Sequence, residues 1–150
     1  MSSPLQTAIA HIDELGAISD SPDYLVRTFL SPANKQAAAK ILEWMTALGM
    51  ETTQAPDGTV RGVLPGENPH NPPLLLGSHY DTVIDAGKYD GALGIIASLV
   101  MLAFGLWWLN REEASARARG EGFGFDGFHS GGDFGFNSRH SFSLFSFNCV

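Results

Sequence analysis

Cysteine is almost absent from this chain of 150 residues, since the one cysteine, Cys149, stands next to the last position. A single thiol cannot form an intramolecular disulfide, so a disulfide-stapled secreted scaffold is excluded and a reducing compartment is expected. Residues 1–20 contain no basic cluster followed by a long apolar run, so they do not resemble a secretory signal. We therefore expect a cytoplasmic protein.

Basic residues are also scarce. Nine Lys and Arg side chains stand against sixteen Asp and Glu, which gives a net charge of -7 at pH 7. Such a chain offers no positive surface for nucleic acid or for an anionic membrane. Its length suffices to bury one core and is too short for two sizeable ones. We expect one domain followed by a tail of different composition.

Two helices are predicted in the first third of the chain. Apolar residues about one turn apart predict a short helix over residues 5–16, with Gly16 as its stop. A second amphipathic helix is predicted over residues 32–48, with Ser31 as N-cap and Gly49 at its carboxyl end. Each helix needs a partner surface for its apolar face.

Three strands are predicted further along. Residues 50–55 and 59–64 are rich in β-branched side chains and are joined by a Pro-Asp-Gly turn. Residues 74–78 are apolar without alternation, which predicts a buried strand covered on both faces. Helices followed by such strands predict an α/β fold with helices packed on a mixed sheet.

Titratable residues cluster directly after the third strand, where His79, Asp81, Asp85 and Asp90 fall within twelve positions. Ligands of open α/β sheets bind beyond the carboxyl ends of strands, so this position favours function. Residues i and i+2 of an extended chain share a side, which allows the Asp81 carboxylate to fix the His79 tautomer for metal binding. Asp90 can offer oxygens to two cations. The alternative is that these residues belong to an ordinary loop with solvated carboxylates. A His-x-Asp pattern taken by itself favours this alternative.

The complete string GSHYDTVIDAGKYDG, residues 77–91, resembles the metal-ligand motif of the zinc-dependent amidohydrolase and peptidase superfamily. That superfamily includes allantoate amidohydrolases and N-carbamoyl-L-amino-acid hydrolases, and the motif is more similar to the former. Four upstream segments look like further landmarks of the same group: residues 17–19, 27–33, 44–50 and 57–62.

The resemblance implies roles for three residues: His79 and Asp90 as metal ligands, Asp90 bridging two ions, and Asp81 as the catalytic carboxylate beside His79. It implies the N-terminal part of a zinc-peptidase-like catalytic domain, with two zinc ions in the full-length family and manganese as a possible replacement. The implied substrate is a small linear ureido or amide compound. The family homodimer is not expected here, because the lid and dimerisation domain is missing.

The resemblance also implies two adjacent glutamates further along, one a general base and one a metal ligand. Residues 122–127 read GFGFDG and contain neither. Asp126 is interpreted as a surface residue, because its shorter side chain would misplace a base. Glu112 and Glu113 are adjacent but lie in a charged stretch typical of a solvated helical face. We therefore expect this chain to have little or no activity.

The composition changes in the Gly-, Phe- and Ser-rich tail of residues 110–150. Eight of the ten phenylalanines fall within residues 123–147. No secondary-structure period holds His129 and His140 in place as ligands. We interpret residues 1–109 as a partial catalytic domain and the tail as disordered or out of the family's reading frame.

Residues 91–109 form an apolar run of nineteen residues without a charge. This run is long enough to span a bilayer, but the resemblance places a helix buried against the sheet here, and we favour that interpretation. The predicted function is allantoate amidohydrolase, with N-carbamoyl-L-amino-acid hydrolase as the alternative. A non-catalytic remnant and a membrane-anchored small protein are alternatives from other classes.

Overall fold

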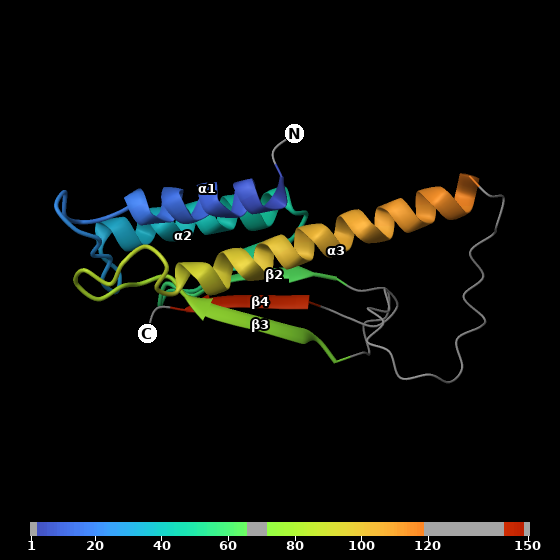
Figure 1. The fold of residues 1–150 in the computed structure, drawn as a ribbon. Coiled ribbons are helices and arrows are strands. Elements are labelled where there is room, and N and C mark those ends of the chain that lie inside the picture. The colour runs from blue at the N-terminus through green and yellow to red at the C-terminus, as the bar shows by residue number, and fades with distance from the viewer. Residues whose placement is uncertain (1–2, 66–71, 119–142, 149–150) are drawn as a thin grey trace.

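The computed structural model describes residues 3–65, 72–118 and 143–148. Three helices lie on one side of a sheet (Figure 1). The predicted α/β class, with helices packed on a mixed sheet, is confirmed. The elements in chain order are α1 (Pro4–Ala17), α2 (Pro32–Ala47), β1 (Glu51–Gln54), β2 (Val60–Leu64), β3 (Leu74–His79), α3 (Ala92–Ala118) and β4 (Ser143–Asn148).

Local side-chain chemistry explains the ends of the first two helices. Ser31 caps α2 as predicted, because its Oγ accepts a hydrogen bond from the backbone N–H of Asn34 at 3.1 Å. Gly49, with φ +80°, follows the helix as predicted. The prediction that Gly16 stops α1 is wrong, since the helix continues through it. A Cβ at Gly16 would lie 2.9 Å from Cβ of Lys88, so this glycine makes room for the loop before α3.

The sheet has the strand order β1-β2-β4-β3. The β1–β2 and β2–β4 pairs are antiparallel, whereas β3 and β4 are parallel. β4 is not among the predicted elements, although it pairs with β3 along its whole length and with β2 from Ser143 to Phe147. Figure 1 shows it between β2 and β3, so a segment of the predicted tail forms an inner strand.

The apolar core lies between the helices and the covered face of the sheet. α2 packs on β1 and β2, α3 packs on β3, and α1 packs on α3. Complete burial of one large aliphatic side chain stabilises a fold by roughly 1.5–3 kcal/mol. The buried apolar residues of this cluster are Ile12, Leu15, Ala37, Ala38, Ile41, Trp44, Met45, Met50, Val60, Tyr80, Ala92, Ile95, Ile96 and Leu99.

The prediction that the third strand is buried on both faces is wrong. In β3, Leu74 is 42% exposed and Leu75 is 62% exposed. β3 lies at the edge of the sheet order, and the three helices cover one face only. An unalternated apolar strand therefore presents part of its apolar surface to solvent in the described structure.

The helix predicted within residues 91–109 is present but longer, and it is buried over its first part only. Ile95 and Leu99 belong to the core, whereas Phe104 and Trp107 are more than half exposed. The difference arises because the second half of α3 extends past the strands (Figure 1). Among the described residues, no helix combines the length and apolarity needed to cross a membrane.

Candidate functional site

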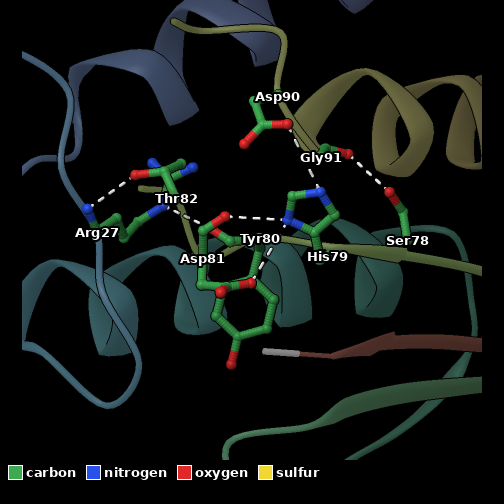
Figure 2. A network of polar contacts seen from close by, with 8 residues as sticks. All are labelled: Arg27, Ser78, His79, Tyr80, Asp81, Thr82, Asp90 and Gly91. Carbon is green, nitrogen blue, oxygen red and sulfur yellow. Dashed lines mark hydrogen bonds and ion pairs between the residues drawn. The ribbon is translucent and has the colours of Figure 1, made fainter. Parts of the chain in front are cut away.

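The three predicted site residues lie together at the carboxyl end of β3 and in the loop that leads to α3. Figure 2 shows the His79 ring between Asp81 on one side and Asp90 on the other. They border a hollow of about 290 Å³. The lining residues are His79, Asp81, Thr82, Val83 and Asp90.

The two ring nitrogens of His79 have different partners. Nδ1 lies 3.1 Å from the backbone oxygen of Asp81 and 3.5 Å from its Oδ1. Because a carbonyl oxygen can only accept, this hydrogen bond requires Nδ1 to carry a proton. Nε2 lies 3.7 Å from Oδ1 of Asp90. The closer partner of Nδ1 is thus the main chain of Asp81, whereas the sequence analysis pointed to its carboxylate.

As a result, two hydrogen-bond acceptors, Nε2 of His79 and Oδ1 of Asp90, face each other. In the neutral ring with a proton on Nδ1, the Nε2 lone pair points toward the Asp90 carboxylate. A cation or a proton between the two atoms would satisfy both. Two zinc ligands with bonds of about 2.0–2.2 Å in tetrahedral coordination lie about 3.3–3.6 Å apart. The separation of Nε2 and Oδ1 is close to that range, so the pair fits one cation.

The set of donors is incomplete as a metal centre. Within residues 3–65, 72–118 and 143–148, no three His, Cys, Asp or Glu side chains come together in a way that could hold an ion. A catalytic zinc site uses three protein ligands and an open position. The described residues therefore bring together two candidate ligands, fewer than such a site uses.

Gly91 allows Asp90 to lie close to His79. Its φ is +64°, and a Cβ there would lie 2.2 Å from the His79 backbone oxygen and 2.7 Å from its Nδ1. Gly94 is similarly close to β3, since its Cβ would lie 2.5 Å from Ser78 Oγ. Ser78 Oγ donates a hydrogen bond of 2.8 Å to the Gly91 backbone oxygen. The first turn of α3 is thus held directly against the end of β3.

Two buried side chains behind the loop were not predicted from the sequence. Arg27 and Tyr80 are both 0% exposed. Tyr80 donates its hydroxyl proton to the Gly58 backbone oxygen at 2.5 Å. Burial lowers the pKa of the Arg27 guanidinium, and the charges of Asp81 and Asp20 act in the opposite direction. The only sequence signal for Arg27 was its place in the resemblance, which gave it no role.

Asp85 does not join the site, in agreement with the absence of an implied role. It adopts φ +58°, and its N–H donates to the Leu25 backbone oxygen at 2.9 Å. Glu112 and Glu113 lie on the α3 backbone, toward its far end. The remaining residues weighed above lie outside the described part of the chain: residues 122–127, His129, His140 and Cys149.

The carboxyl ends of two parallel strands meet at the site, because His79 of β3 pairs with Asn148 of β4. This edge is where α/β sheets bind their ligands. The position of the site therefore follows from the sheet topology as well as from the motif.

Comparison with known proteins agrees with the resemblance. No family model matches the chain. Allantoate deiminase 2 of Glycine max is 46% identical over 95 residues, 63% of this chain and 20% of that protein. N-carbamoyl-L-amino-acid amidohydrolase of Pseudomonas sp. (strain NS671) is 37% identical over 90 residues, 59% of this chain and 22% of that protein. This chain thus spans about a fifth of the length of the curated relatives it matches.

A hydantoinase/carbamoylase family amidase from Burkholderia ambifaria has a similar fold, with a TM-score of 0.61 at 22% identity over 67% of this chain and 24% of that one. The fold is therefore that of part of an amidohydrolase- or peptidase-like domain. Over about three fifths of its length, the chain is homologous to the allantoate amidohydrolase and N-carbamoyl-L-amino-acid hydrolase family, which confirms the resemblance.

Proposed function

We propose that His79 and Asp90 form one edge of a divalent-cation site, with zinc as the first candidate ion and manganese as the second. The observation that carries this proposal is the 3.7 Å approach of Nε2 to Oδ1 while Nδ1 is engaged by Asp81. An imidazole nitrogen and a carboxylate oxygen suit zinc, and the carboxylate also suits manganese. A second metal bound by Asp90 belongs to the same proposal.

The activity proposed for the family site is hydrolysis of a C–N bond in a small linear ureido or amide compound, with allantoate first. The soybean relative named above is an allantoate deiminase. The Pseudomonas relative makes N-carbamoyl amino acids the second candidate. Bound zinc supplies a Lewis acid and lowers the pKa of a coordinated water. The chain's own part is to hold the ring with Nε2 toward Asp90 and to keep Asp81 against Nδ1.

For this chain alone we propose little or no hydrolysis. A zinc hydrolase needs a base and a third ligand, and within the described residues no group of three His, Cys, Asp or Glu side chains is arranged to hold an ion. Purified protein with added zinc or manganese is expected to leave allantoate intact. Turnover at an ordinary enzymatic rate, about 1 per second or faster, would overturn this proposal.

Metal content tests the site itself. In equilibrium dialysis against zinc, we expect the full chain to bind more zinc than His79→Ala and Asp90→Asn do. Asp85→Asn is the matched control, because it removes a carboxylate from the same loop but outside the hollow. Equal zinc content in all four proteins would remove the site hypothesis. Loss in the control alone would do the same.

A further inference from the structure

Arg27 lies behind the candidate site and binds the main chain beside it. Its Nε donates to the Tyr80 backbone oxygen at 2.6 Å. Its Nη1 donates to the backbone oxygens of Leu15 at 2.5 Å and Ile18 at 2.9 Å. One side chain therefore joins the end of α1 to the loop that follows β3.

The backbone of Arg27 holds the same loop a second time. Its N–H donates to Thr82 Oγ1 at 2.9 Å, and its carbonyl oxygen accepts from the Thr82 N–H at 2.9 Å. Figure 2 shows Arg27 on the side of the loop opposite the His79 ring. Tyr80 and Thr82, the two neighbours of Asp81, are thus both bound to Arg27.

These contacts determine where the Asp81 carbonyl points. The Thr82 N–H and the Asp81 C=O belong to one planar peptide unit, in which they point in opposite directions. Since the N–H is directed at Arg27, the carbonyl is directed away from it, toward Nδ1 of His79. The Nε contact with Tyr80 fixes the preceding peptide plane in the same way.

The burial of Arg27 also has an energetic cost. Arg27 is 0% exposed, and its Nη2 has no hydrogen-bond partner within the described residues. A buried charged group with an unsatisfied donor is unfavourable.

We propose that Arg27 is a positioning residue for the candidate metal pair. By holding the two peptide planes around Asp81, it keeps the Asp81 carbonyl on Nδ1 of His79 and leaves Nε2 open toward Asp90. The functional role given to Arg27 rests on the proposed metal site. The effect of Arg27 on the His79 tautomer does not, because the tautomer is measured in the metal-free protein.

The test is ¹⁵N NMR of the His79 ring in the metal-free full chain, at a pH of about 8.5 where imidazoles are in general neutral. The wild-type ring is expected to carry its proton on Nδ1. In Arg27→Met the ratio of the Nδ1–H to the Nε2–H form should fall about two- to tenfold, the range for one weakened hydrogen bond. Arg27→Lys keeps the charge but not the fork of donors, and it should show the same direction.

Ile41→Val on α2 is the control, because it perturbs the core away from the Arg27 contacts and should leave the ratio unchanged. If Arg27→Met does not fold, the Lys variant decides the matter. A folded variant with the wild-type ratio overturns the proposal, as does an equal change in the control.

Titration with Co²⁺ alone separates this proposal from the metal site. Weaker Co²⁺ binding and an altered visible absorption spectrum are expected in both Arg27 variants but not in Ile41→Val. Wild-type protein that binds no Co²⁺ would refute the metal site, while the tautomer ratio would still decide the role of Arg27.

Discussion

The two proposed ligands are held in place by different kinds of contact. His79 is placed by the interior, because buried Arg27 and Tyr80 hold the residues that follow it. Asp90 ends a largely exposed loop, whose outer support is the exposed Lys88–Asp13 ion pair at 2.5 Å. What brings Asp90 to the ring is the close approach of the next residue, Gly91, to β3. An interior network thus places the imidazole, and one glycine places the carboxylate.

Gly91→Ala should produce the largest effect. The added Cβ would meet the His79 backbone oxygen at 2.2 Å, in a backbone conformation that already disfavours a side chain. We expect a loss of about 3 kcal/mol or more in unfolding free energy, measured by urea denaturation. Gly87→Ala is the matched control, since φ is +82° and a Cβ there meets nothing within 4 Å. Its cost should be about 1–2 kcal/mol, and equal costs would refute the role of the close contact.

Tyr80→Phe tests the interior side. The change leaves the Gly58 backbone oxygen without its buried partner, so a loss of about 1–3 kcal/mol in unfolding free energy is expected. Tyr89→Phe removes a hydroxyl from an exposed residue of the same loop and should stay within about 0.5 kcal/mol. If both variants lose the same unfolding free energy, the buried hydrogen bond from Tyr80 to Gly58 does not hold the loop.

Lowering the pH should have a smaller effect on the unfolding free energy. It acts through His11 on α1, the helix that also carries Asp13. Burial lowers the pKa of His11 from its usual 6.5; Glu14 opposes this shift and Lys40 adds to it. The ring is stacked on Trp44 with centroids 4.1 Å apart. Because the folded state favours the neutral ring, the unfolded chain binds the proton more readily.

The contribution of the neutral His11 ring to the unfolding free energy is fully present above about pH 6.5, the usual pKa of an unfolded-state histidine. It declines as the pH falls below that pKa. Urea midpoints should therefore decrease as the pH is lowered from about 7.5 to about 5.5. His11→Phe keeps an aromatic ring on Trp44 and should flatten part of that dependence. An unchanged slope would assign the dependence to other groups.

The smallest effect is expected from the exposed ion pair. Lys88→Met and Asp13→Asn should each leave the urea midpoint within its experimental scatter, because exposed pairs contribute little and are screened by salt. A loss as large as that of Gly87→Ala would show that the ion pair, and not Gly91 alone, places Asp90.

The parts of the fold that depend on neighbouring residues were predictable. Ser31 and Gly49 bound α2 as expected, and the predicted strands correspond to β1, β2 and β3 within a residue or two. The site segment was predictable as well, because His79 and Asp90 are close in sequence and lie after a strand.

Contacts between distant segments were not predictable in the same way. β4 carries no strong period of its own, and its place between β2 and β3 depends on pairing with both. The exposure of Leu75 depends on which face of the sheet the helices cover. Arginine is usually found at the surface. Arg27 is buried here because backbone carbonyls of α1 and of the site loop accept its hydrogen bonds.

By itself, the sequence determined the ends of α2, the α/β order and the identity of the segment from Gly77 to Gly91, since caps, periods and motifs are local properties of the chain. The tertiary structure decided which oxygen meets Nδ1 of His79 and which nitrogen faces Asp90. The reason is that a carbonyl's direction depends on the partner of the next peptide N–H, and for Thr82 that partner lies 55 residues away in Arg27.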